Sequence, residues 1–243
     1  PVSAMVAETL GSLQNRKLRT HGPQVPMPRD IPVGNGDLLI TFDKMYRVRD
    51  IYYPNVGRFN HTEGNVQRFG VWVDGMFAWI EELGWERTLK YRPDTLVTEV
   101  LLRNKHLGLE IICNDAVDFH HPVYLRRSLV KDLTGKDRDV RLLNHWDLSV
   151  RGTPVGDTAS YDPTTSSVIV YKDDAYFLFN AGDENKSGLD NWAIGTKRVR
   201  GAEGTWRDAE DGILGRNAIS QGSVDTTIGA NLQVPAHGSA SVT

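Results

Sequence analysis

The stretch R-F-G-V-W-V-D-G-M-F-A-W-I, residues 68–80, joins two apolar runs through Asp74-Gly75. Asp-Gly between such runs is a strong hairpin signal, because a type I′ turn needs a positive φ at both central positions. Residues 107–113 alternate apolar with mixed positions, so one face of an extended chain is wholly apolar there. Residues 140–148 repeat this alternation. These segments predict antiparallel β-strands.

Similar apolar segments, separated by turn residues, recur about every 8 to 12 positions after residue 30. Further examples are residues 38–42, 48–53, 124–131, 168–171, 175–180 and a final strand at 241–243. About a dozen or more strands exceed what one open sheet usually holds, because sheets of more than about ten strands tend to split into two packed layers. We therefore expect an all-β fold, a large antiparallel sandwich. Residues 182–215 predict a long irregular excursion with one strand at 192–197.

The first 30 residues differ from the rest of the chain. Their apolar positions follow a loose helical spacing, and Gly22 and three prolines come next. We predict an N-terminal arm or short helix over residues 1–30 and a single β domain over residues 31–243, since no repeat or composition shift divides the remainder.

Charge and cysteine content exclude several classes of function. The 28 Lys and Arg residues against 31 Asp and Glu give a net charge of −3, which argues against nucleic acid and membrane surfaces as partners. The single Cys113 excludes an internal disulfide and any zinc site that needs two thiolates. No run approaches the roughly 20 apolar residues of a membrane span, and no signal peptide is visible. We expect a cytoplasmic protein without metal or cofactor.

Most motifs that could bind a ligand or catalyse a reaction have a simpler structural interpretation. Gly34-Asn35-Gly36 precedes a strand rather than a helix, which favours a turn over a phosphate-binding loop. His120-His121 would point to opposite faces of an extended chain, which is poor geometry for a metal. The acidic cluster Asp208, Glu210 and Asp211 could supply a glycosidase-like acid and base, although a chain with 31 acidic residues produces such clusters by chance.

The most distinctive segment is the connection that contains Tyr52, Tyr53, Asn60, His61 and Thr62. Long connections between strands concentrate binding residues, and tyrosine and histidine suit the apolar faces and hydroxyls of sugars. The alternative is structural: the tyrosines cap the core, and the polar side chains satisfy backbone groups of the turn. The residues themselves leave both interpretations open.

Four motifs in order carry a resemblance to a known family. They are V-G-N-G-D-L-L-I-T-F-D (33–43), R-D-I-Y-Y-P-N-V-G-R-F-N-H-T (49–62), R-F-G-V-W-V-D-G (68–75) and A-E-D-G-I-L-G-R-N-A-I-S-Q-G-S-V-D-T (209–226). Together they resemble the N-terminal domain of bacterial and archaeal glucoamylase-like proteins, the glycoside hydrolase family 15 type that includes glucodextranases. The resemblance covers nearly all of residues 32–243.

This resemblance implies a supersandwich of two large antiparallel sheets, related to the galactose-mutarotase fold. In the family, an (α/α)6 barrel with two catalytic glutamates follows the sandwich and inverts the anomeric centre. No position of this chain matches those glutamates, so we expect no catalytic residue here and a domain separated from a longer enzyme. The expected partners are the catalytic barrel and an α-glucan, and the 52–62 loop is expected to reach the barrel's active-site mouth.

Two alternatives from other classes remain. A free-standing carbohydrate-binding module is one, with Trp192 and Trp206 as the rings that stack on sugars. An aldose epimerase is the other, because the fold relationship allows it; it needs a histidine and carboxylate pair, for which His145 with Glu110 or Asp147 is conceivable.

Overall fold

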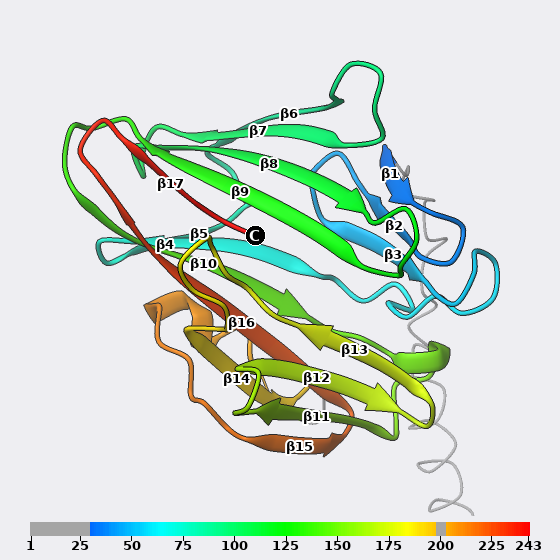
Figure 1. Cartoon of the computed structure of the whole chain (residues 1–243). Coiled ribbons are helices and arrows are strands. Elements are labelled where there is room, and N and C mark those ends of the chain that lie inside the picture. Colours follow the sequence, from blue (N-terminus) through cyan, green and yellow to red (C-terminus); the bar gives the residue numbers. More distant parts are fainter. Residues whose placement is uncertain (1–29, 198–202) are drawn as a thin grey trace, which may run out of the picture.

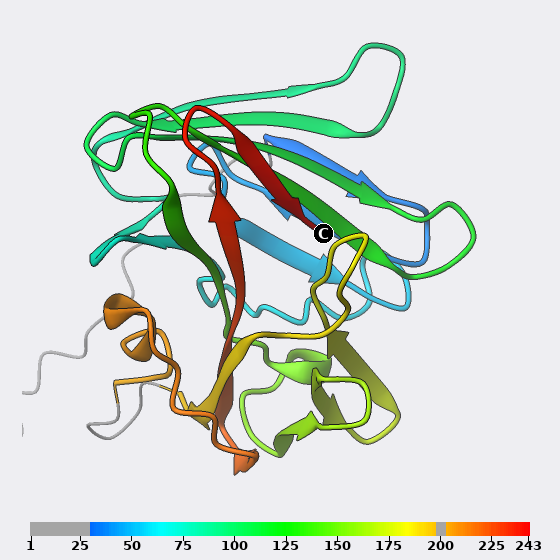
Figure 2. The same ribbon diagram turned by 60° about the vertical axis from the view of Figure 1, so that its left-hand side comes forward.

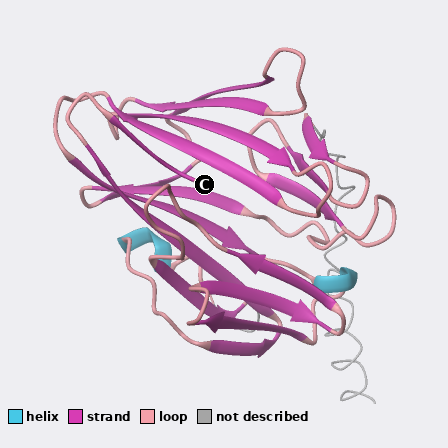
Figure 3. Ribbon diagram, in the orientation of Figure 1, coloured by secondary structure: helices cyan, strands magenta, loops and turns pink. Residues whose placement is uncertain are grey.

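The computed structural model of the chain describes residues 30–197 and 203–243. The predicted N-terminal arm, apart from Asp30, therefore lies outside the described residues. Strands dominate, and two short 3-10 helices, η1 (Val150–Gly152) and η2 (Asp208–Asp211), are present in the described part (Figure 3). The strands are β1 (Ile31–Gly34), β2 (Leu39–Phe42), β3 (Val48–Tyr52), β4 (Arg68–Val73), β5 (Met76–Trp79), β6 (Trp85–Tyr91), β7 (Thr98–Asn104), β8 (Leu109–Val117), β9 (Tyr124–Asp132), β10 (Arg138–Trp146), β11 (Asp157–Asp162), β12 (Ser167–Lys172), β13 (Ala175–Phe179), β14 (Asn191–Thr196), β15 (Ile219–Gly222), β16 (Val224–Val234) and β17 (Ser239–Val242).

Hydrogen bonds join these strands into four antiparallel sheets (Figure 1). Sheet A has the order β1-β2-β3, and sheet B has the order β14-β16-β10-β4-β5. Sheet C has the order β17-β9-β8-β7-β6, and sheet D has the order β13-β12-β11-β15. The predicted all-β antiparallel class is thus confirmed, while the grouping into two large sheets stays a prediction.

The hairpin expected at Asp74-Gly75 forms between β4 and β5. Val73 pairs with Met76, and the two turn residues have φ values of 49° and 87°. This is the left-handed region that a two-residue hairpin turn requires at both positions. The predicted turn is confirmed.

The alternating segment around Cys113 also forms a strand as predicted. Leu109, Ile111 and Cys113 of β8 are fully buried on one face, and the residues between them are half-buried. A strand with one buried face and one partly solvent-exposed face belongs to a sheet that packs on the core with one side only. Burial raises the pKa of the Cys113 thiol to about 11, which keeps the thiol in its unreactive protonated form.

One cluster of buried apolar side chains includes residues of all four sheets. Strand β10 shows how the sheets meet, because Arg138 and Trp146 lie on the same face at its two ends. Arg138 donates to Asp132 of β9 in sheet C, at 3.2 Å, whereas Trp146 stacks on Phe179 of β13 in sheet D, at 5.0 Å between ring centroids. Sheets C and D therefore pack on the same face of sheet B.

The opposite face of sheet B is covered by residues 203–215, here called the strap, which includes η2 (orange in Figure 2). Ala209 and Leu214 of the strap pack with Leu143 and Trp79 in a second buried cluster. The prediction of an irregular excursion with one strand fits this region, since β14 lies close to the predicted residues 192–197.

No helix within residues 30–197 and 203–243 is long and apolar enough to cross a membrane.

Candidate functional site

The 52–62 loop leaves sheet A at the end of β3 and returns beside it. Tyr52 forms an isolated bridge with Asn60, and the Tyr53 N–H donates to Phe59 O at 3.4 Å. Tyr52 and Tyr53 are half-buried, while residues 54–58 at the tip are exposed. Val56, the apolar side chain of this tip, is 54% exposed.

His61 is buried at the base of the loop, and both of its ring nitrogens are used. Its Nε2 lies 3.0 Å from Tyr53 O, and its Nδ1 lies 3.0 Å from the Arg151 N–H. A carbonyl can only accept and a backbone N–H can only donate, so the ring is neutral with its proton on Nε2. Its edge packs on Phe177, at 4.7 Å between centroids. Burial lowers the pKa of His61, and the Arg151 charge acts in the same direction against the hydrogen bond to Tyr53.

Asn60 and Thr62 are also engaged in the base of the loop. The Asn60 amide donates to Asp50 Oδ1 at 2.8 Å, and its Oδ1 accepts from the Ile51 and Thr62 N–H groups at 3.2 Å each. The Thr62 hydroxyl donates to Arg49 O at 2.8 Å. The structure therefore brings Asn60, His61 and Thr62 together as a hydrogen-bonded base, and the exposed tip is the part of the loop that is free to meet a partner.

Trp192 and Trp206 do not form a common platform. The Trp192 ring stacks on Tyr161, with centroids 3.6 Å apart and planes 3° apart, and Arg216 lies 5.3 Å from the ring centroid. Trp206 packs against the second cluster, across sheet B from Trp192, which packs against the main core. The Arg207 and Arg68 guanidinium groups lie 4.1 and 5.2 Å from the Trp206 ring. Both rings are half-buried and occupied by neighbouring side chains.

The histidine and carboxylate pairs considered from the sequence do not form. His145 Nε2 lies 3.0 Å from Asp225 Oδ2, and both side chains are buried under the strap. Asp147 pairs with Lys197 at 2.8 Å, and Glu110 pairs with Lys131 at 3.5 Å. The buried His145–Asp225 pair has no described opening to a substrate and anchors the strap, because Asp225 Oδ2 also accepts from the Thr205 N–H at 3.0 Å.

The acidic cluster lies in and around η2. Burial raises the pKa of Asp208, and the nearby Asp211 carboxylate adds to this effect. Glu210 is paired with Arg207 at 2.9 Å, and Asp211 caps the Ile213 N–H at 2.8 Å. In the described ranges, no group of three or more His, Cys, Asp or Glu side chains is arranged to hold a metal ion.

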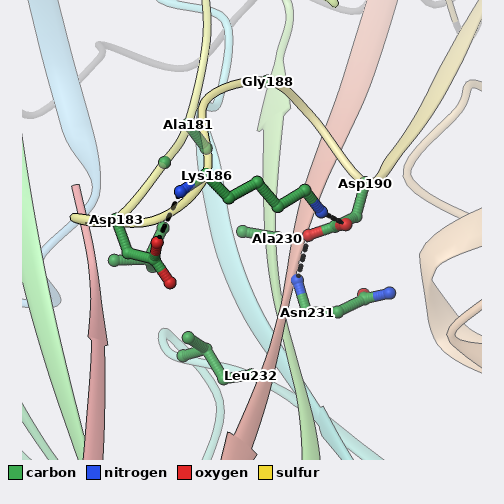
Figure 4. Close-up of a pocket in the computed structure, with 10 residues that line it drawn as sticks. Ala181, Asp183, Lys186, Gly188, Asp190, Ala230, Asn231 and Leu232 are labelled. Atoms are coloured by element: carbon green, nitrogen blue, oxygen red, sulfur yellow. Dashed lines mark hydrogen bonds and ion pairs between the residues drawn. The ribbon is translucent and has the colours of Figure 1, made fainter.

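A small pocket lies where the 181–190 loop meets β16 (Figure 4). Lys186 and Asp190 form an ion pair across it, and Asp190 Oδ2 accepts from the Asn231 N–H at 2.8 Å. The pocket has room for about one water molecule. The polar groups of the pocket form hydrogen bonds and an ion pair with one another, so these contacts order the 181–190 loop.

Sequence reasoning missed one set of residues, the outward side chains of sheet D around Tyr171 and Tyr176. Tyr176 is 61% exposed, and its ring stacks on Tyr171 with centroids 5.3 Å apart. Only the strand register brings these side chains together with residues of β11 and β15. Apolar alternation in residues 168–171 and 175–180 signals the strands but not this shared face.

Comparisons with known proteins show the fold. No protein-family model and no curated protein matches the chain. Among solved structures, a crystal structure of a bacterial glucoamylase complexed with acarbose is similar, with a TM-score of 0.67, over 89% of this chain and at 10% sequence identity. The matched part is 32% of that chain, so the present chain spans about one third of the glucoamylase that it resembles. At this identity the likeness establishes a shared fold.

Proposed function

We propose that this chain is the non-catalytic supersandwich domain of a glucoamylase-like α-glucan hydrolase of glycoside hydrolase family 15, packed on a catalytic (α/α)6 barrel. The observation that carries the proposal is the structural match to one third of a bacterial glucoamylase over 89% of this chain. The glucoamylase-like motifs, which run in the expected order from residue 33 to residue 226, support it independently.

The arrangement of the sheets supports the supersandwich. Sheets C and D contact the same face of sheet B through the two ends of β10, as Arg138 and Trp146 indicate. Gly182, just after β13, and Thr243, just after β17, exchange backbone hydrogen bonds of 2.9 and 2.8 Å. In the proposed supersandwich, sheets C and D make up one layer, and sheets A and B make up the other.

The 52–62 loop is the proposed contact with the barrel. Its base is held by the buried His61 and by the Asn60 hydrogen bonds, so these residues act by fixing the loop. Val56 and Arg58 at the exposed tip are the side chains that meet the barrel near its active-site mouth.

The test measures kcat/KM on maltoheptaose in the full-length protein that carries this chain. We expect the double variant Val56→Asp, Arg58→Glu to lower kcat/KM at least tenfold without a change in thermal stability, because both side chains are exposed. The matched control is Leu96→Asp, at a 70% exposed hairpin residue, which leaves kcat/KM unchanged. His61→Ala and Asn60→Ala are expected to lower both kcat/KM and the melting temperature, because these two residues hold the base of the loop.

Two outcomes contradict the proposal. Unchanged kcat/KM in the tip variant would remove the loop from the active-site mouth. Release of glucose from maltoheptaose by residues 1–243 alone would show that the domain is itself catalytic.

A further inference from the structure

The outward face of sheet D carries two rows of side chains that cross all four strands. Alternate residues of a strand share a face, so the register of the sheet defines each row. The first row is Tyr176, Tyr171, Thr158 and Gln221, and the second is Leu178, Ile169, Ser160 and Ile219. Tyr176, Leu178, Gln221 and Ile219, at the two edges, are exposed.

These two rows carry no charge, unlike the outward face of sheet C, and Asp162, the next residue of β11 on this face, accepts hydrogen bonds from the turn that follows it. On the outward face of sheet C, Glu86, Arg103, Glu110 and Lys131 are successive cross-strand neighbours in a single row. Alternating charges are what a permanently solvated sheet face usually carries. The eight side chains on sheet D are aromatic, aliphatic, hydroxyl or amide groups, so a ligand can cover them without removing a charge from water.

The polar groups of the sheet D face are unused. Within the described residues, no hydrogen bond reaches the side chains of Tyr171, Tyr176, Thr158, Ser160 or Gln221. Hydroxyl and amide groups both donate and accept, which is the pattern that a polyhydroxylated neutral ligand needs. Free donors and acceptors beside apolar surface are typical of sites that fix a small ligand's orientation.

Tyr176 supplies the aromatic surface that Trp192 and Trp206 do not. Among the Phe, Tyr and Trp side chains of the described residues, only Phe119, at 83%, and Tyr176, at 61%, are more than half exposed. Phe119 lies in the loop between β8 and β9, whereas Tyr176 stands in a row that includes a second tyrosine. The row spans four strands, about 14 Å, which accommodates a short oligosaccharide.

We propose that this face of sheet D binds a neutral oligosaccharide, an α-1,4-glucan, with Tyr176 and Tyr171 against the apolar faces of the sugar rings. The half-buried Ser160 and the exposed Gln221 take the sugar hydroxyls. The choice of an α-glucan among neutral sugars rests on the proposed function. The site lies on residues of the present chain, so it binds without a catalytic domain.

Isothermal titration of residues 1–243 with maltoheptaose tests the proposal. We expect saturable binding, weakened at least tenfold in Tyr176→Ala and in Gln221→Ala. Phe119→Ala is the matched control, because it removes an even more exposed ring away from sheet D and leaves binding unchanged. Equal melting temperatures of all four proteins show that the variants remain folded.

The outcomes separate this inference from the proposed function. Absence of wild-type binding, or binding that survives Tyr176→Ala, overturns the inference and leaves the barrel-docking proposal untouched. A concentration-dependent dimer that Tyr176→Ala abolishes, in sedimentation without sugar binding, also overturns it, because the face then contacts a second copy of the chain. Binding of maltoheptaose together with a failed test of the 52–62 loop would leave sheet D as a glucan-binding face on its own.

Discussion

At the scale of single residues, the buried carboxylate of Asp115 in sheet C organises the contact with the β2–β3 connection of sheet A. It accepts from the Arg126 guanidinium at 2.9 Å, from the Tyr46 hydroxyl at 2.6 Å and from the Thr98 hydroxyl at 2.7 Å. The Tyr124 hydroxyl also donates to it. The Arg126 guanidinium in turn lies over the Tyr46 ring, at 4.7 Å. The stability of a buried carboxylate in such a network depends on each of its hydrogen-bond partners.

Asp115→Ala is therefore expected to cost about 3–5 kcal/mol of unfolding free energy, because it leaves the Arg126 charge buried without its partner. Urea unfolding followed by fluorescence measures this loss. Glu86→Ala is the control: it breaks the exposed pair with Lys105 and should leave the urea midpoint unchanged. A loss for Asp115→Ala no larger than that of the control would contradict this account.

His61 makes stability depend on pH. Burial lowers its pKa in the folded chain, so the unfolded chain takes up the proton first as the pH falls. Stability contributed by neutral His61 is present above the ordinary histidine pKa and is lost as the pH drops from about 7 towards 5. His61→Gln should therefore flatten the pH dependence of the urea midpoint in this range. His106→Gln, at an exposed histidine, should keep the wild-type slope, and equal slopes in both variants would refute the role of His61.

At the scale of elements, the strap depends on a close approach at Gly212. A Cβ atom there would lie 2.8 Å from the Trp72 ring, and the residue has a φ of 77°. Gly212 O also accepts from Arg141, at 2.6 Å, and Arg141 stacks on Trp72. The strap therefore stays on sheet B through a contact that excludes any side chain at this position.

Gly212→Ala should release the strap and speed tryptic cleavage at Arg207. Gly36→Ala is the matched control, because Gly36 has a φ of 102° but no atom within 4 Å of the added Cβ. Both variants carry backbone strain of about 1–2 kcal/mol, because both glycines have a positive φ. A faster cleavage of the strap in Gly212→Ala alone therefore reports the clash with Trp72. Equal cleavage rates would mean that this contact does not hold the strap.

The strands that the sequence predicts well are those with one face exposed to solvent. β8 alternates cleanly because its outward residues meet water, and the β4–β5 turn has the residues that its backbone requires. β16 was missed because residues 224–230 are buried on both faces, between the main core and the strap. Its Thr226, Thr227 and Gly229 give no apolar alternation, and a Cβ atom at Gly229 would lie only 2.9 Å from the Leu143 side chain.

The candidate site was less predictable than the fold, since it depends on contacts between distant segments. The composition of the 52–62 loop makes it a candidate site, but only the Arg151 and Tyr53 contacts reveal that His61 holds the base of the loop. Residue type alone suggests Trp192 as a ring that stacks on sugars. Its partner Tyr161 lies 31 positions away on another sheet (192 − 161 = 31), which no local pattern indicates.

At the scale of the whole molecule, one apolar cluster includes residues of all four sheets. Every sheet contributes to this cluster, so the sheets should lose their packing together. We expect a single urea transition in which far-UV circular dichroism and tryptophan fluorescence coincide. Two separated transitions would instead indicate that sheet D, or another sheet, unfolds independently.

The pairing of β10 with β16 has a mechanical consequence. Residues 138–146 lie antiparallel to residues 226–234 in continuous register, and this ladder lies at the centre of sheet B. A force that shears these two strands along their axes loads all the backbone hydrogen bonds between them at once. A force on the β12–β13 turn instead breaks the hydrogen bonds between those two strands one after another. In a pulling experiment with single molecules, attachment points at the two ends of the β10–β16 ladder should therefore give the higher rupture force.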